Sequence, residues 1–264
     1  MSVVADQLFD DIMTIEDELT QFCHFGDQLT RLPFPFIGKP PVSRFEMIDP
    51  PSAALEFAPG HFEYYGREAF AKIYNDIKAL NYWRGYSMYY LSGTLGYGKS
   101  YILAAVACLL IRQGFKVVYL PDCRGLVRAF CGYLRAALLL TFAGKRALQE
   151  EILACSDDKT LVDWCTNIKD KLYFIVDQIN ALDTCEEALD SVSKRSREKC
   201  SHYISVFEQV HYLIFSSSGN YQHGIRQSVK QSGVKREGSF WRTIRGWCIP
   251  RTGCSKCCLI YASE

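Results

Sequence analysis

The sequence predicts an α/β fold in which helices cover both faces of a central, mostly parallel sheet. Short apolar runs alternate with helical patterns from about residue 62 to residue 217, as in parallel sheets whose strands are buried on both faces. A glycine-rich segment at 93–100 lies between one apolar run and a helical pattern. Another apolar run ends in an acidic residue, Asp177. Together these observations place the chain in the α/β class.

The expected elements follow in order along the chain. Residues 5–30 carry a helical pattern of apolar side chains. Seven of the nine prolines fall within residues 33–59, so an extended connector without regular structure is expected there. The remaining pattern predicts helices at 67–80, 99–113, 124–143, 145–154, 159–168 and 184–199, and strands at 86–91, 115–121, 171–177 and 210–217.

The chain is expected to have three parts. Beyond Asn220 the sequence is polar and without periodicity, apart from a short strand pattern in "CCLIY". We therefore predict an amino-terminal helix and proline-rich connector at 1–60, a core domain at 61–222, and a basic, cysteine-containing, poorly ordered tail at 223–264.

Composition narrows the function classes. A formal net charge of +1 argues against a strong overall field for nucleic acid or anionic membranes. The start of the chain lacks the basic region and apolar core of a signal peptide, and the apolar runs at 102–111 and 134–143 are too short to span a bilayer. Twelve cysteines without a secretion signal indicate reduced thiols. An intracellular location without a membrane partner is expected.

The segment GTLGYGKS matches the pattern G-x-x-x-x-G-K-[ST] at every specified position and sits between a strand and a helix, as phosphate binding requires. Glycines let backbone N–H groups converge on phosphate oxygens at the positive end of the next helix. The lysine ammonium would bridge phosphates, and the serine hydroxyl would ligate Mg²⁺. The alternative is a strand–turn–helix without a ligand. The expected nucleotide-binding residues are Gly93, Thr94, Leu95, Gly96, Tyr97, Gly98, Lys99 and Ser100.

A site for Mg²⁺ and a triphosphate needs a second oxygen ligand, normally an acid at the end of a buried strand beside the first. Asp177 follows five apolar residues and fits that role, which makes Ser100 and Asp177 the expected metal ligands. The alternative is that Asp177 merely ends a strand or caps a helix. Gln178 follows where many nucleotide hydrolases place a general base; a glutamine can orient water but cannot accept a proton as a carboxylate does.

A later apolar run reaches its carboxyl edge with Ser216, Ser217, Ser218 and Asn220. Ligands of open α/β sheets bind outside the carboxyl ends of strands, so these groups are candidates to touch the γ-phosphate or to position water. Among them Ser218 is the expected catalytic residue, together with Asp177 and Gln178. A serine-rich turn that satisfies its own backbone is the structural alternative.

The order of "YYGRE", "GTLGYGKS", "FIVDQINALD" and "LIFSSSGN" resembles the AAA+/STAND branch of P-loop ATPases, and more narrowly the NTPase module of Crinkler-type effector proteins of fungi and oomycetes. The resemblance covers about residues 60–220. It implies a P-loop NTPase three-layer sandwich and a role for Arg67 in holding adenine. Members of that family usually continue into a helical lid, which we expect to be missing or truncated in this chain. The resemblance also implies ATP rather than GTP, since the chain has no N-K-x-D guanine motif.

On this resemblance the expected function is a Mg²⁺-dependent NTPase that serves as the nucleotide module of a Crinkler-like effector, in the cytoplasm or a host nucleus. A nucleotide-binding scaffold deficient in hydrolysis is one alternative. A nucleic-acid-associated effector fragment is another. A protein partner or self-association is also among the expected interactions.

Other signals are weaker. One C-x-x-C pair in "CSKCC" is a poor zinc signature, so reduced cysteines are expected there. The basic segment "KRSREK" at 194–199 lies late in its expected helix, where cations complement the helix dipole; nuclear import or nucleic-acid binding is the alternative.

Overall fold

The computed structural model describes residues 1–16, 19–23, 30–37, 60–80, 87–91, 98–183 and 191–217. Within them, four parallel strands form a central sheet in the order β3-β6-β5-β4. The strands are β3 (Met88–Leu91), β4 (Val117–Leu120), β5 (Tyr173–Val176) and β6 (Tyr212–Ser216). The predicted α/β class with a parallel sheet is confirmed.

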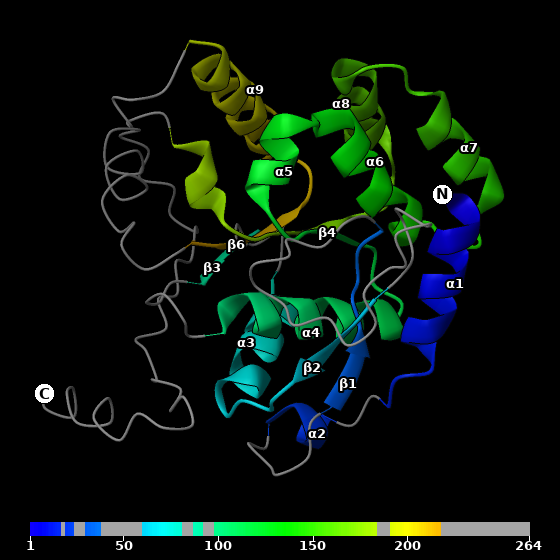
Figure 1. The fold of residues 1–264 in the computed structure, drawn as a ribbon, viewed down its shortest axis with the longest axis vertical. Helices are drawn as coiled ribbons and strands as arrows, with labels where there is room; N and C mark the ends of the chain where they lie inside the picture. Colours follow the sequence, from blue (N-terminus) through cyan, green and yellow to red (C-terminus); the bar gives the residue numbers. More distant parts are fainter. Residues whose placement is uncertain are drawn as a thin grey trace, which may run out of the picture.

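Helices cover both faces of this sheet and complete the predicted three layers (Figure 1). One face carries α4 (Lys99–Arg112), with α3 (Ala69–Lys78) beyond it. The other face carries α5 (Cys123–Arg128), α6 (Phe130–Thr141), α8 (Asp158–Asn167) and α9 (Ser191–Glu208), with α7 (Arg146–Ala154) beside α6. The helix α1 (Ser2–Met13) contacts both α4 and α6 and so joins the two helical layers.

The strands β4 and β5 and the helix α4 are apolar on all sides because other elements cover each of their sides. Every residue of β4 and of β5 is buried. Helix α4 is buried along nearly its whole length, since it lies between the central sheet and a two-stranded antiparallel sheet of β1 (Thr30–Pro33) and β2 (His61–Tyr64). A helix that is hydrophobic all round requires such a position. This two-stranded sheet was not predicted, because its strands are short and flank the proline-rich segment.

The amino-terminal residues share the core of the later residues. Asp6 on α1 accepts hydrogen bonds from the Gly144 N–H (2.8 Å) and from Nε2 of Gln149 (3.0 Å). Phe34 packs edge-on to Tyr119 of β4, with ring centroids 6.0 Å apart. The buried apolar side chains on both sides of residue 60 belong to one hydrophobic cluster. The division of the chain at residue 60 stays a prediction.

Three predicted helical segments differ from the structure. The pattern at 5–30 is not one helix, because it contains α1 and a second helix, α2 (Leu19–Cys23), and its last residue begins β1. The helix expected at 184–199 is α9, which runs Ser191–Glu208 because Ile204 and Phe207 near its end are buried. The basic segment 194–199 therefore occupies the early turns of α9, and the explanation by the helix dipole is wrong. Local acceptors hold two of its cations instead: Lys199 pairs with Asp158 (2.7 Å), and Arg197 donates to the backbone carbonyl of Asp183 (2.6 Å).

The helix expected at 124–143 is two helices, α5 and α6, which are separated at Ala129 (φ −149°, ψ 65°). A residue in that conformation cannot continue an α-helix.

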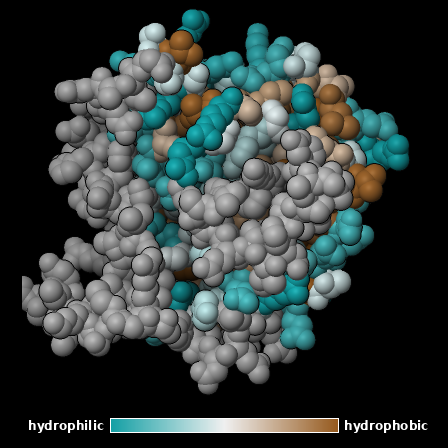
Figure 2. Space-filling view, viewed as in Figure 1, coloured by the Kyte–Doolittle hydropathy of each residue, from teal (hydrophilic) through white to brown (hydrophobic). Residues whose placement is uncertain are grey.

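Few large hydrophobic residues of the described part of the chain are exposed. On the face drawn in Figure 2, the coloured side chains are mostly hydrophilic, with separate hydrophobic ones between them. The exposed large hydrophobic residues are Met1 and Val3 at the start of α1, Tyr65 after β2, Leu153 on α7 and Val192 on α9. Across the described ranges, no helix has the length and apolar character needed to cross a membrane.

Candidate functional site

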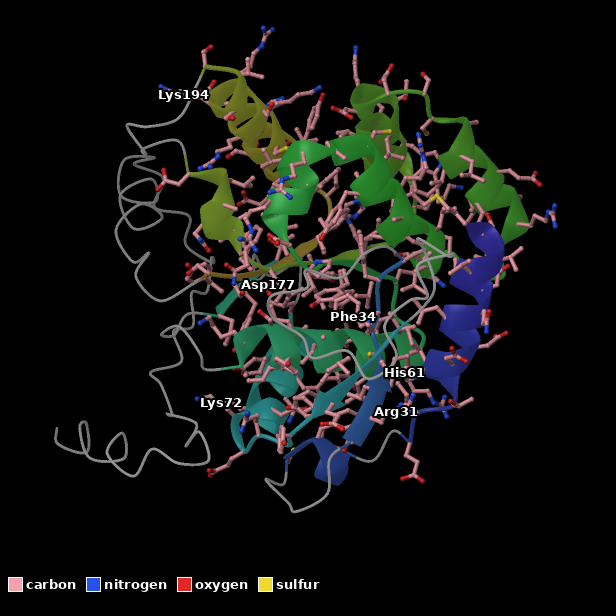
Figure 3. The ribbon with its side chains drawn as sticks, in the orientation of Figure 1. Arg31, Phe34, His61, Lys72, Asp177 and Lys194 are labelled. Atoms are coloured by element: carbon pink, nitrogen blue, oxygen red, sulfur yellow. The ribbon has the colours of Figure 1, made fainter. Side chains whose placement is uncertain are left out.

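The candidate site lies where the parallel strands end. Because β3, β4, β5 and β6 run in one direction, their carboxyl ends meet at one edge of the sheet, where open α/β folds bind ligands. Asp177 lies at this edge (Figure 3). Helix α4 begins after β3 and brings Lys99 to the same region.

Lys99 is the first residue of α4, and its side chain is only 8% exposed. The preceding Gly98 has φ 71° and ψ 20°, a left-handed conformation that glycine adopts without the steric cost of a side chain. Burial lowers the pKa of Lys99, and the negative charge of Asp177 opposes that shift. The structure thus brings together two predicted site residues that are distant in the sequence.

Asp177 is held firmly and is fully buried. Its backbone N–H donates to the Leu120 carbonyl (2.9 Å), and its carbonyl accepts from the Cys123 N–H (3.2 Å). Its carboxylate accepts a hydrogen bond from the hydroxyl of Ser216, which is also fully buried. Backbone and side chain together fix the direction of this carboxylate.

The sequence predicts that the strand before Asp177 lies beside β3, but in the structure β5 is not a neighbour of β3. Strand β6 lies between β3 and β5, with Leu91 of β3 paired to Ser216 of β6. This insertion is what brings the serines at the end of β6 into the middle of the edge. Strand order depends on long-range pairing, which a local pattern does not encode.

Two consecutive serines connect β6 to both of its neighbours. Ser216 bonds to Asp177 after β5, and the hydroxyl of Ser217 shares a hydrogen bond with that of Tyr90 on β3. Burial raises the pKa of Tyr90, and the bond to Ser217 acts against that shift. The sequence predicts that both serines contact phosphate or water, or form a turn that satisfies its own backbone. In the structure their described partners are the side chains of Asp177 and Tyr90. Tyr90 was not among the predicted site residues.

Gln178 adopts a backbone conformation that is uncommon for a residue with a side chain. Its φ is 63° and its ψ is 44°, in the left-handed region that non-glycine residues rarely occupy. Its carbonyl accepts from the Ala181 N–H (2.9 Å) and starts the 3₁₀ helix η2 (Ile179–Leu182). The chain therefore turns sharply directly after Asp177.

A second carboxylate at this edge is already paired. Asp122 follows β4, is 7% exposed and caps α5 by accepting from the Arg124 N–H (2.9 Å). Arg124 also binds the same carboxylate through its guanidinium, with Nη2 2.8 Å from Oδ2. The hydroxyl of Tyr133 accepts from the Asp122 N–H (3.0 Å). None of these three residues was predicted; a polar residue directly after the apolar run at 115–121 was the available signal.

The other predicted site residues are less fully placed. Gly93, Thr94, Leu95, Gly96, Tyr97 and Ser218 lie outside the described residues, as do Asn220 and the tail. Ser100 lies half-buried in the first turn of α4, and its role toward a metal stays a prediction. The backbone N–H of Arg67 donates to the Phe22 carbonyl (2.9 Å), and its side chain lies near Tyr64 and Tyr65. The role of Arg67 toward adenine also stays a prediction.

Comparison with known proteins gives only distant structural similarity. No protein-family model matches the sequence, and no curated protein matches it. A DNA replication initiation factor is 15% identical with a TM-score of 0.37, and AMPPCP-bound DnaA from Aquifex aeolicus is 12% identical with a TM-score of 0.38. PCH-2 from C. elegans is 12% identical with a TM-score of 0.36.

These matches cover 67% of this chain in each case but only 44%, 45% and 42% of the respective known chains. The chain thus spans less than half the length of each. Similarity at this level does not establish a family.

Proposed function

We propose that this chain binds ATP together with Mg²⁺ through a P-loop and acts as an NTPase of the AAA+/STAND type. The observation that carries the proposal is the approach of Lys99, at the start of α4, to Asp177, at the end of β5. A buried lysine at a helix amino terminus, preceded by a left-handed glycine, supports recognition of phosphate. The motif at 93–100 supports the same assignment.

The residues present suit a magnesium nucleotide. Mg²⁺ prefers oxygen ligands, and the hydroxyl of Ser100 and the carboxylate of Asp177 are the candidates to hold it. Lys99 and the N–H groups at the start of α4 would hold the phosphates. When bound, the metal would neutralise charge that develops on the transferred phosphoryl group. ATP is proposed over GTP because the sequence lacks a guanine-binding motif.

Binding without turnover is the second candidate function, and Gln178 favours it. Gln178 directly follows Asp177, and its amide cannot accept a proton from the attacking water as a carboxylate can. We expect Gln178→Glu to raise the rate of phosphate release, by roughly 10²-fold or more if the new carboxylate acts as general base. Phosphate release that Gln178→Glu leaves unchanged would remove Gln178 from the catalytic proposal. Steady phosphate release by the native chain, lost in Asp177→Asn, would rule out the nonhydrolysing scaffold.

The narrower assignment, the nucleotide module of a Crinkler-like effector, rests on the order of the sequence motifs alone. It carries the proposals of a protein partner or self-association, a cytoplasmic or host nuclear location, and contact with nucleic acid through the basic tail. Gel shifts at low salt that disappear on deletion of residues 220–264 would support the nucleic-acid role.

Titration of the purified chain with a fluorescent ATP analogue tests the main proposal. We expect Lys99→Ala to weaken binding by at least tenfold, because it removes a buried cation from the phosphate site. Lys72→Ala is the matched control, since Lys72 is exposed on α3 away from Asp177 (Figure 3). Equal affinity of native and Lys99→Ala protein would refute the proposal.

A further inference from the structure

The cysteines of the described residues differ in the surroundings of their thiols. Four are buried, whereas Cys23, Cys131 and Cys155 are half-buried. Burial raises the pKa of the buried Cys200 to about 11, and thiols in such surroundings react slowly. Cys131 and Cys155 are different because both contact one guanidinium group.

Cys131 lies at the start of a helix and beside the side chain of an arginine. It is the second residue of the twelve-residue helix α6, whose amino terminus has no side-chain cap, and helix amino termini carry partial positive charge. One turn further, Arg135 places its Nη2 3.1 Å from the sulfur of Cys131. A helix amino terminus and an adjacent arginine are both surroundings in which cysteines become reactive.

The same nitrogen of Arg135 also contacts Cys155. Nη2 donates to the backbone carbonyl of Cys155, the residue that ends α7. The thiol of Cys155 donates to the carbonyl of Glu151 (3.4 Å), and burial raises its pKa, although Arg135 opposes that shift. Arg135 thus contacts Cys131 through its sulfur and Cys155 through its backbone, and this difference distinguishes the two cysteines.

We propose that Cys131 and Cys155 are a peroxide-sensitive thiol pair, in which Cys131 attacks the oxidant and Cys155 closes a disulfide. This assignment is independent of nucleotide binding. In the first step the Cys131 thiolate attacks one oxygen of hydrogen peroxide and the O–O bond breaks. The departing hydroxide takes a proton, which leaves a sulfenic acid and one water.

In the second step the sulfur of Cys155 attacks the sulfenic sulfur of Cys131 and the S–O bond breaks. The hydroxyl group leaves with the proton of Cys155 as a second water. Two thiols are thus oxidised by two electrons while one peroxide is reduced to two waters. The bond would join the first turn of α6 to the connection between α7 and α8, two helices that both pack against α6.

The pair is tested by treating the full chain with hydrogen peroxide, blocking the remaining thiols and mapping tryptic peptides without reduction. Trypsin separates the two residues, because Cys131 lies in AFCGYLR and Cys155 in ALQEEILACSDDK. To simplify the map, serine replaces the cysteines outside the described residues, which are Cys185, Cys248, Cys254, Cys257 and Cys258. We expect these two peptides to be joined, and Cys131 to be oxidised faster than half-buried Cys23.

Arg135→Gln should slow the oxidation of Cys131 by about three- to tenfold, since it removes the adjacent cation, and Arg135→Lys should restore most of the rate. Thermal unfolding of each variant separates this effect from a loss of folding. Oxidation of Cys131 no faster than that of Cys23, or a disulfide from Cys131 to any cysteine other than Cys155, would overturn the proposal.

Discussion

Replacing Ser216 by alanine probes the hydrogen bond that fixes the candidate metal ligand. In the native chain the Ser216 hydroxyl donates to the carboxylate of Asp177, and both residues are 0% exposed. Water therefore cannot easily replace the lost donor. A hydrogen bond to a charged group contributes about 1.5–3 kcal/mol, and we expect Ser216→Ala to lower the free energy of unfolding by about that amount.

Urea denaturation without nucleotide measures this loss, and Ser205→Ala is the control. Ser205 lies exposed on α9, where its hydroxyl donates only to the His202 carbonyl one turn earlier. Its removal should change stability by less than about 0.5 kcal/mol. If Asp177 holds Mg²⁺, Ser216→Ala should also weaken Mg²⁺-dependent nucleotide binding more than binding measured without the metal. A stability equal to that of the native chain would refute the importance of this bond.

Two further predictions concern the rest of the fold. His211 is 1% exposed, its Nδ1 accepts from the Leu172 N–H (3.3 Å), and its Nε2 donates to the Cys165 carbonyl (2.8 Å). Burial lowers its pKa to about 4. The contribution of the neutral ring is complete above pH about 6.5 and is lost as the pH falls from there towards 4, by about 3 kcal/mol in total. Urea midpoints of the native chain and of His211→Gln at pH 8 and pH 5 check this, and equal pH dependence of the two would contradict it. Deleting residues 1–37 should abolish cooperative unfolding in thermal denaturation, because the deleted buried side chains contribute on the order of 10 kcal/mol, comparable to the whole stability of a domain. A cooperative transition close to that of the full chain would show that the core stands without them. The buried apolar side chains that this deletion removes are Ala5, Leu8, Ile12, Phe22, Leu32, Phe34, Phe36 and Ile37.

The strands and helices of the core could be predicted where local signals were strong. The apolar run before Asp177 is β5, and the helix expected to start at Lys99 starts there. The predicted ends of helices were wrong where the burial of residues beyond the predicted end made the helix longer. Helix α9 extends to Glu208 because its last turns pack against the core, and no residue near 199 signals that it should continue.

The candidate site could be predicted only in part, for the same reason. Lys99, Asp177 and the serines of β6 are recognisable as residue types at the ends of their elements. The other polar residues at this edge are not, because Tyr90, Asp122 and Tyr133 act through contacts made by neighbouring strands and helices. Nothing in the local sequence around Tyr90 specifies that its hydroxyl meets Ser217.

The sequence by itself determined the alternation of strands and helices, the phosphate-loop pattern and the acid that ends β5, because periodicity and turn chemistry are local properties. Only the tertiary structure decided that β6 lies between β3 and β5, that Ser216 holds Asp177, and that one arginine joins two cysteines. Strand order and side-chain partners depend on which surfaces bury one another, and that is settled by the packing of the whole chain.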